Sequence, residues 1–165
     1  MAAAVAVAAL IGLGSQAGAT PLPVNGGWVY DQVNNAIDPS DNSPWTFTLT
    51  KSGVFSITDY FNVGDNYDVF DGVSFLLTTA LGLLPSYWGV IGDPLGEAGW
   101  TSADFQHGQI LLGAGSYALN IFGDGAGGFS AGFYVRVDQV PEPATMALLG
   151  LGLAGLGIAR RRKVA

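Results

Sequence analysis

The sequence lacks cysteine altogether and has a single histidine, and both shortages restrict its chemistry. Without cysteine, disulfides, catalytic thiols and thiolate metal sites are excluded. The one histidine, His107, stands in the polar stretch Gln106-His107-Gly108, where we expect a surface turn rather than a metal ligand. The 165 residues provide room for one domain. A segment of about 120 residues can bury a core without disulfides.

Basic residues are scarce in the middle of the chain. Between Thr20 and Val140, the two basic residues Lys51 and Arg136 stand against twelve acidic residues, which gives a formal charge of −10. A segment this acidic repels phosphate backbones, so we expect no nucleic-acid partner. The same acidity keeps an exported domain soluble and offers oxygen ligands to hard cations such as Ca²⁺.

The N-terminus has the features of a signal peptide. Ala2 to Leu13 is an unbroken apolar run of about 18 Å as a helix, too short for a bilayer core of about 30 Å. Ala17 and Ala19 form a small-x-small cleavage site, so we predict that signal peptidase removes residues 1–19. The alternative is a helix of the mature fold, which would show a polar face that this run does not have.

The C-terminus combines three features in a fixed order. Pro141, Glu142 and Pro143 precede an apolar stretch at 144–159, and a basic cluster at 160–163 follows. The apolar stretch predicts a single transmembrane helix of about 24 Å. Snorkelling basic side chains would cover the shortfall from the bilayer core of about 30 Å. The basic cluster predicts a cytoplasmic C-terminus by the positive-inside rule, which places the preceding domain outside the cytoplasm.

Together these three features resemble the PEP-CTERM sorting signal, which is found in Gram-negative bacteria that often make exopolysaccharide. The resemblance implies that residues 140–165 are a sorting signal whose Pro141, Glu142 and Pro143 are recognised by exosortase, a protease of the inner membrane. It also implies that the helix is a transient anchor and that the protein ends at the cell surface or outside the cell. The stop-transfer end would consist of Arg160, Arg161 and Arg162.

Residues 20–139 alternate apolar and polar residues as strands do. We predict an all-β domain, either a small antiparallel β-sandwich or a jelly roll, in which Gly53 and Asp71-Gly72 each turn a hairpin. A helix over Phe75 to Leu84 is an alternative to a strand there, and we expect no other helix in the domain. The predicted strands are Trp28 to Val33, Trp45 to Thr50, Val54 to Thr58, Tyr67 to Phe70, Val73 to Thr79, Ser116 to Phe122 and Phe129 to Val137.

The middle segment also resembles a loose family of secreted domains, most of them uncharacterised. The shared features are Pro44-Trp45-Thr46-Phe47, the Asp- and aromatic-rich stretch from Asp59 to Asp71, and the run from Leu112 to Tyr117. The resemblance implies a β-sandwich and says little about activity.

Four acidic residues around Gly64 are candidate calcium ligands: Asp59, Asp65, Asp68 and Asp71. Carboxylates and backbone carbonyls in turns can hold Ca²⁺, although this spacing is not that of a helix–loop–helix calcium site. The alternative is that these side chains cap local backbone amides, as Asp commonly does in turns.

Aromatic residues are candidates for contact with sugars. Trp45 alternates in phase with Phe47 and should lie in the core, whereas Tyr87, Trp88 and Trp100 are predicted in loops and are freer to stack on a glycan.

Catalytic patterns are weak. Gly128-Phe129-Ser130-Ala131-Gly132 matches the G-x-S-x-G pattern of serine hydrolases, but the only histidine precedes this serine instead of following it. We expect Phe129 and Phe133 to point into the core instead. A pair of carboxylates facing each other across a cleft could hydrolyse glycosides, and the sequence alone does not reveal such a pair.

The sequence therefore predicts a cell-surface or matrix-associated protein, sorted by an exosortase-type system, that is structural or exopolysaccharide-associated and is not an enzyme. The alternative is a carbohydrate-binding module assisted by calcium, and a small secreted hydrolase is the least favoured hypothesis.

Mass spectrometry of the protein from its native cell tests both terminal predictions. We expect an N-terminus at Thr20 and a C-terminus near Pro143, because both apolar ends are removed during export. Recovery of the intact chain from the cytosol, with Met1 and Ala165 both present, would contradict the prediction.

Overall fold

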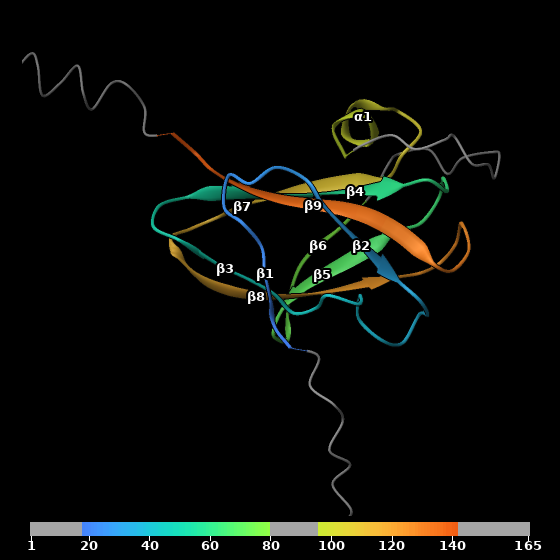
Figure 1. Cartoon of the computed structure of the whole chain (residues 1–165), viewed down its shortest axis with the longest axis horizontal. Helices are drawn as coiled ribbons and strands as arrows, with labels where there is room; N and C mark the ends of the chain where they lie inside the picture. Colours follow the sequence, from blue (N-terminus) through green and yellow to red (C-terminus); the bar gives the residue numbers. More distant parts are fainter. Residues whose placement is uncertain (1–17, 80–95, 142–165) are drawn as a thin grey trace, which may run out of the picture.

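The protein is a two-layered β-sandwich in the computed structural model, which describes residues 18–79 and 96–141 (Figure 1). This confirms the predicted all-β sandwich. The predicted signal helix at 1–17 and the predicted transmembrane helix at 144–159 lie outside the described residues. Within residues 18–79 and 96–141, no helix has the length and apolar character needed to cross a membrane.

Two sheets make up the sandwich. One sheet has five strands in the order β1-β3-β8-β5-β6, and the other has four in the order β2-β9-β4-β7. All the strand pairs are antiparallel except β1 with β3. The strands of the first sheet are β1 (Thr20–Pro21), β3 (Trp45–Leu49), β8 (Gly115–Gly123), β5 (Tyr67–Asp71) and β6 (Ser74–Thr78). Those of the second are β2 (Val29–Val33), β9 (Ala131–Gln139), β4 (Gly53–Tyr60) and β7 (His107–Leu112).

The predicted hairpin between β3 and β4 is wrong, although both strands exist. β3 pairs with β8 and β1, whereas β4 pairs with β7 and β9 in the opposite sheet. The chain therefore crosses between the layers after β3. Phe47 of β3 and Phe55 of β4 face each other across the core with ring centroids 6.4 Å apart and planes only 2° from parallel. Both strands have an apolar face, and crossing between the sheets buries one face against the other.

Other sequence-based strand predictions hold. β5 and β6 form the predicted hairpin, whose turn places Gly72 at φ 58°, a conformation that glycine adopts without strain. The strand predicted at Trp28 to Val33 forms as β2, at an edge of the four-stranded sheet. β6 runs to Thr78 as a strand in place of the alternative helix. β9 begins at Ala131, later than predicted, so Phe129 lies before it and is 48% exposed instead of pointing inward. Phe133 is fully buried, as predicted.

Three elements were not predicted: β1, β7 and the helix α1 (Gly96–Thr101). The expectation of no further helix was wrong because packing, not helix propensity, holds α1 in place. A Cβ on Gly96 would lie 2.4 Å from the Trp28 ring, and one on Gly99 would lie 3.2 Å from the Asp59 carbonyl oxygen. The two glycines thus let the helix approach the outer face of the four-stranded sheet, as Figure 1 shows. His107 begins β7 and is half-buried, which corrects its predicted surface turn.

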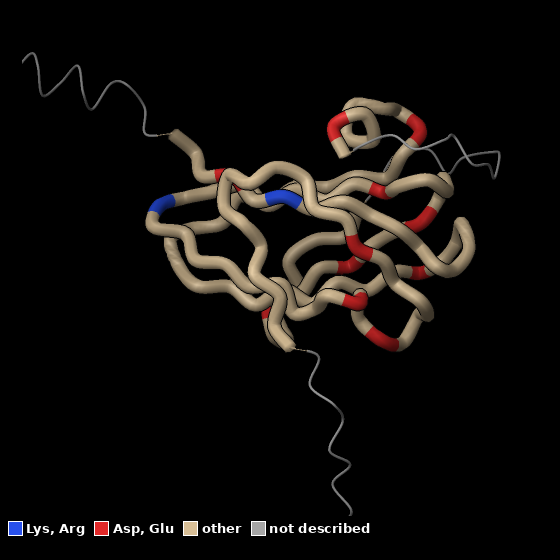
Figure 2. The backbone as a smooth tube through the Cα atoms, in the orientation of Figure 1, with Lys and Arg blue, Asp and Glu red and all other residues tan. Residues whose placement is uncertain are grey.

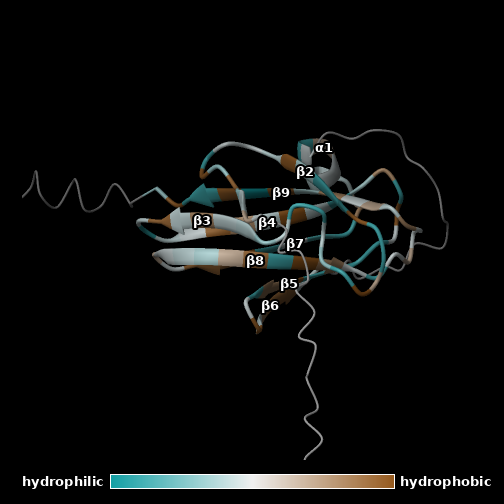
Figure 3. Cartoon of the chain, turned by 60° about the horizontal axis from the view of Figure 1, so that its bottom comes forward, coloured by the Kyte–Doolittle hydropathy of each residue, from teal (hydrophilic) through white to brown (hydrophobic). Residues whose placement is uncertain are grey.

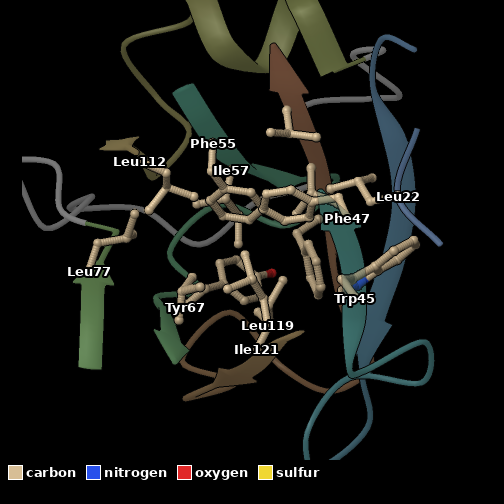
Figure 4. Close-up of a cluster of buried hydrophobic side chains, with 14 of the residues drawn as sticks. Leu22, Trp45, Phe47, Phe55, Ile57, Tyr67, Leu77, Leu112, Leu119 and Ile121 are labelled. Atoms are coloured by element: carbon tan, nitrogen blue, oxygen red, sulfur yellow. The ribbon is translucent and has the colours of Figure 1, made fainter. Parts of the chain in front are cut away.

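The core fills the space between the two sheets (Figure 4). Trp45 is buried at 2% exposure, as its alternation with Phe47 predicts, and Phe55 and Ile57 are fully buried. The edge hairpin of β5 and β6 is not wholly buried. Its apolar segments (brown in Figure 3) include the exposed residue Phe75.

Truncation of a core ring should destabilise the fold far more than truncation of a surface side chain on the same sheet. We expect Phe55→Ala to lower the free energy of unfolding by about 3–5 kcal/mol, since it removes a buried ring and leaves a cavity. Leu111→Ala on β7, where the side chain is 67% exposed, should change it by less than about 0.5 kcal/mol. Urea denaturation of both variants measures the difference, and equal effects would contradict the assigned facing of the strands.

Candidate functional site

The outer face of the four-stranded sheet carries a cluster of tyrosines from three neighbouring strands. Tyr30 of β2 pairs with Tyr134 of β9, and Tyr60 of β4 lies beside them. Each ring meets the other two nearly edge-on, with centroids 5.3 Å apart for Tyr30 and Tyr60, 5.6 Å for Tyr30 and Tyr134, and 5.0 Å for Tyr60 and Tyr134. This is the favourable geometry for aromatic pairs, so the three rings fix one another in place.

Phe61 extends the cluster at the end of β4. Its ring centroid lies 6.0 Å from that of Tyr60, and its side chain is 42% exposed. Its backbone has φ 69°, a left-handed conformation that bulky residues rarely adopt. Gly132 of β9 lies beneath the rings, because a Cβ there would come within 3.0 Å of the Tyr60 ring and 3.1 Å of the Tyr30 hydroxyl. We call Tyr30, Tyr60, Phe61 and Tyr134 the aromatic face.

A hydrogen-bonded polar network borders the aromatic face. The Tyr30 hydroxyl donates to Gln32 Oε1 (3.2 Å), and Gln32 Nε2 donates to Asn34 Oδ1 and Asp41 Oδ2 (3.1 Å each). Asn34 Nδ2 donates to Asp41 Oδ1 (2.6 Å), and the Ser130 hydroxyl donates to Asn34 Oδ1 (2.8 Å). We call Gln32, Asn34, Asp41 and Ser130 the polar rim. Its side chains hold one another in fixed orientations close to the exposed Tyr30 ring.

Helix α1 and two tryptophans occupy another part of the same outer face. The Arg136 guanidinium lies 4.3 Å from the centre of the Trp28 ring, and the ring centroids of Trp28 and Trp100 lie 5.7 Å apart. Glu97 accepts hydrogen bonds from Trp28 Nε1 (3.0 Å) and Arg136 Nη1 (2.9 Å). These two partners, Trp28 first, lower the pKa of the Glu97 carboxyl. Trp100, predicted in a loop, is instead a half-buried residue of α1 that helps to hold the helix on the sheet.

Two buried carboxyls close one end of the sandwich. Asp59 follows Ile57 on the inward side of β4 and is 1% exposed, and Asp65 is fully buried. The Tyr67 hydroxyl, from the opposite sheet, lies 2.7 Å from the Gly132 carbonyl oxygen and 3.2 Å from Asp59 Oδ1. Asp59 also accepts from Tyr60 N (2.7 Å) and Gly64 N (3.2 Å). The contacts of the Tyr67 hydroxyl with Gly132 and Asp59 therefore connect the two sheets.

Burial determines the protonation of these groups. Desolvation, followed by the charge of Asp65, raises the pKa of Asp59 to about 8. Desolvation also raises the pKa of Asp65 to about 6, since one hydrogen bond from Gly127 N (2.6 Å) compensates only in part. The other oxygen of Asp65, Oδ2, has no hydrogen-bond partner among the described residues. Burial raises the pKa of Tyr67 as well, so its phenol stays protonated.

The four predicted calcium ligands do not form one cluster. Asp59 and Asp65 lie together inside the fold, but Asp68 alternates with the buried Tyr67 and projects from the outer face of β5, where it accepts a hydrogen bond from Thr78. Asp71 accepts from Ala118 N at 3.1 Å. In residues 18–79 and 96–141, no group of three or more His, Asp or Glu side chains is placed to hold a metal ion. Strand alternation separates side chains that are close in sequence.

A hollow of about 460 Å³ on the five-stranded sheet includes Asp68 and Asp124 in its lining. The glycosidase hypothesis requires such a pair of carboxylates, but both are engaged in local structure. Asp124 accepts from Asn66 N (2.9 Å), Asn66 Nδ2 (2.8 Å) and Ala126 N (3.0 Å), which orders its own loop.

The G-x-S-x-G segment likewise lacks the geometry of a serine nucleophile with its base. The single hydroxyl proton of Ser130 is donated to Asn34, and Nδ1 of His107 lies 3.0 Å from the Phe105 carbonyl oxygen. A serine hydrolase requires the hydroxyl to donate to a histidine.

The folded domain begins and ends close to the two predicted processing sites. Ala19 is exposed, and Thr20 N donates to the Pro44 carbonyl oxygen (3.0 Å) at the start of β1. Pro141 is exposed two residues after β9 ends. The remaining predicted site residues lie outside the described residues, namely Ala17, Tyr87, Trp88, Glu142, Pro143, Arg160, Arg161 and Arg162.

Residues 139–163 match the family described as the PEP-CTERM protein-sorting motif. The chain carries a PEP-CTERM sorting signal. This confirms the resemblance drawn from the Pro-Glu-Pro tripeptide, the apolar stretch and the arginines. A PEP-CTERM signal implies export with processing by exosortase at the membrane. The matched region begins at the last residue of β9, so the signal follows the sandwich without an intervening linker.

Two further similarities each cover part of the chain. A glucose N-acetyltransferase 1-B of Kluyveromyces lactis is 37% identical over 71 residues, which cover 39% of this chain. The match spans only 16% of that protein's length. The pre-peptidase C-terminal domain of a collagenase from Bacillus anthracis aligns with a TM-score of 0.41 and 9% identity, over 72% of this chain and 93% of that one.

Sequence reasoning missed the aromatic face. Tyr134 alternates with the inward residues Phe133 and Val135, so its outward direction was readable from the sequence. The meeting of Tyr134 with Tyr30 and Tyr60 was not, because it depends on the pairing of β9 with both β2 and β4.

The buried carboxyls make stability depend on pH. An unfolded Asp loses its proton near pH 4, whereas folded Asp59 and Asp65 keep theirs to about pH 8 and about pH 6. Folding therefore takes up protons in this window, so the contribution of these two carboxyls to stability is fully present below about pH 4 and is lost as pH rises toward 8. We expect Asp59→Asn to flatten this decline in melting temperature, while Asp104→Asn, at an exposed position, preserves it. Parallel slopes for wild type and Asp59→Asn would contradict the assignment.

Proposed function

We propose that the mature protein is a non-catalytic component of the cell surface or extracellular matrix that associates with exopolysaccharide. The observation that carries the proposal is the PEP-CTERM signal attached directly to a small β-sandwich. Export and exosortase processing deliver the sandwich outside the cytoplasm, so its role is exercised there.

A structural role is supported by how the described polar side chains are used. The buried carboxyls of Asp31 and Asp59 both link the two sheets. Asp31 accepts a hydrogen bond from Trp45 Nε1 at 3.0 Å. Asp59 Oδ1 lies 3.2 Å from the Tyr67 hydroxyl. Both carboxyls hold the layers together and are buried, at 2% exposure for Asp31 and 1% for Asp59. This supports the proposal that the domain is not an enzyme.

The charge distribution supports an extracellular role that does not involve binding to nucleic acid. Figure 2 shows acidic residues distributed over the described chain, with Lys51 and Arg136 as its basic residues. Arg136 is already paired with Glu97 (2.9 Å) and Asp138 (3.3 Å). A surface of this kind stays soluble and is repelled by polyanions.

A carbohydrate-binding module is the second candidate, and the aromatic face favours it. Exposed rings beside fixed amides and carboxylates are the groups that recognise sugars, by stacking and by hydrogen bonding. Calcium assistance stays a separate hypothesis. Among the described acidic residues, Asp65 Oδ2 is the buried oxygen that has no hydrogen-bond partner to satisfy it. Isothermal titration of the protein with Ca²⁺ tests this idea.

Cell fractionation tests the proposed function. We expect the wild-type protein to lack its C-terminal tail and to be enriched in the extracellular polysaccharide fraction. Replacing Pro141, Glu142 and Pro143 by alanine should leave the full-length tail in the inner membrane, because exosortase no longer recognises it. Asp104→Ala, on the exposed loop after α1, is the control and should be processed normally.

A strain that makes no exopolysaccharide completes this test. There the processed protein should shift from the matrix to the culture medium. Retention of the wild-type protein in the cytoplasm, or an unchanged distribution without exopolysaccharide, would contradict the proposal.

A further inference from the structure

We propose that Tyr30 and Phe61, with the polar rim beside Tyr30, form a binding face for a neutral polysaccharide. The inference rests on the proposed function and adds a site and a ligand class to it. It differs from the sequence-based expectation, which assigned sugar contact to Tyr87, Trp88 and Trp100.

The exposure of these rings is the first argument. Tyr30 is 43% exposed and Phe61 is 42% exposed, and both contact Tyr60 on the same side of the sheet. Phe61 also has φ 69°, a left-handed backbone conformation that is strained for a bulky side chain. Strained residues of this kind cluster at sites of ligand contact, and the exposed part of the Phe61 ring is accessible to a ligand.

The rigidity of the rings is the second argument. Tyr60 and Tyr134 are half-buried and contact Tyr30 edge-on, so they support its ring from two strands. Gly132 provides the space into which Tyr30 and Tyr60 lean. A ring fixed in this way loses little rotamer entropy on binding, which favours stacking on the apolar C–H face of a sugar.

The polar rim supplies the groups that sugar hydroxyls require. Gln32, Asn34, Asp41 and Ser130 present amide, carboxylate and hydroxyl atoms whose orientations are already fixed by mutual hydrogen bonds. These atoms have both donor and acceptor capacity beyond the bonds they make. The core of a protein–protein interface is depleted of charged residues, whereas Asp41 stands among these groups.

Charge selects a neutral ligand over an anionic one. Asp41 lies within the polar rim, and Asp31 and Asp41 both contribute to raising the pKa of Tyr30, after desolvation. The basic residues of the described chain, Lys51 and Arg136, belong to neither the aromatic face nor the polar rim, and Arg136 is held by Glu97, Asp138 and Trp28. A uronate or sulfated polymer would meet repulsion here without a compensating cation.

Binding of the full-length protein in detergent micelles to defined polysaccharides tests this site. The neutral probes are dextran, β-glucan and galactomannan, and alginate is the anionic probe. We expect a neutral probe to bind and alginate not to bind. Tyr30→Ala and Phe61→Ala should each weaken that binding about three- to tenfold, as loss of one aromatic contact implies.

Two variants separate a binding role from a structural one. Tyr30→Phe keeps the ring and should retain most of the binding, which a general loss of stability would not explain. Phe75→Ala removes a ring of similar exposure, 56%, from the other sheet and should bind as the wild type does. Melting temperatures measured alongside confirm that each variant is folded.

The inference is overturned if no neutral probe binds, if alginate binds as well as they do, or if Tyr30→Ala and Phe75→Ala have equal effects. The proposed function is tested separately by fractionation. A protein that is found in the matrix but is unaffected by Tyr30→Ala would refute this site and leave the proposed function standing.

Discussion

Each sheet has one apolar face, and the packing of these two faces against each other is the constraint on which the rest of the structure depends. Phe47 and Phe55 stack across the interface, and Trp45, Tyr67 and Phe133 fill the space around them. With apolar residues committed inward, every second residue of a strand points away from the core. The aromatic face and the polar rim are built from outward positions of the four-stranded sheet and from its adjoining loops.

Polar groups at the sandwich interface reinforce this packing. Trp45 donates to Asp31 and Tyr67 reaches Asp59, so aromatic side chains of one sheet meet buried carboxyls of the other. A buried carboxyl without such a partner would be costly, and even here desolvation keeps the pKa of Asp59 far above its usual range. The acidic stretch around Gly64 is therefore partly structural, since two of its carboxyls lie inside the fold and two are bonded to neighbouring strands.

Delivery and recognition occupy different parts of the chain. The PEP-CTERM signal begins where β9 ends, so removal of the tail leaves the paired strands of the sandwich intact. The face proposed for polysaccharide lies on β2, just after β4 and in the adjoining loops, beside the sheet whose strand β9 leads into the signal. A domain released or displayed by such processing keeps this proposed surface whatever its final attachment.

The sequence by itself determined the sorting signal, the β class and most strands, because local order and two-residue alternation carry that information. The Pro-Glu-Pro tripeptide before an apolar stretch and arginines is recognisable without any contact to the domain. Only the tertiary structure decided that β3 and β4 lie in opposite sheets and that α1 packs on the sheet through two glycines. It also decided that Asp59 and Asp65 are buried, whereas Asp68 and Asp71 lie elsewhere. It also brought Tyr30, Tyr60 and Tyr134 together. Such groupings depend on long-range strand pairing and on which face is buried, and neither is encoded within a short segment of sequence.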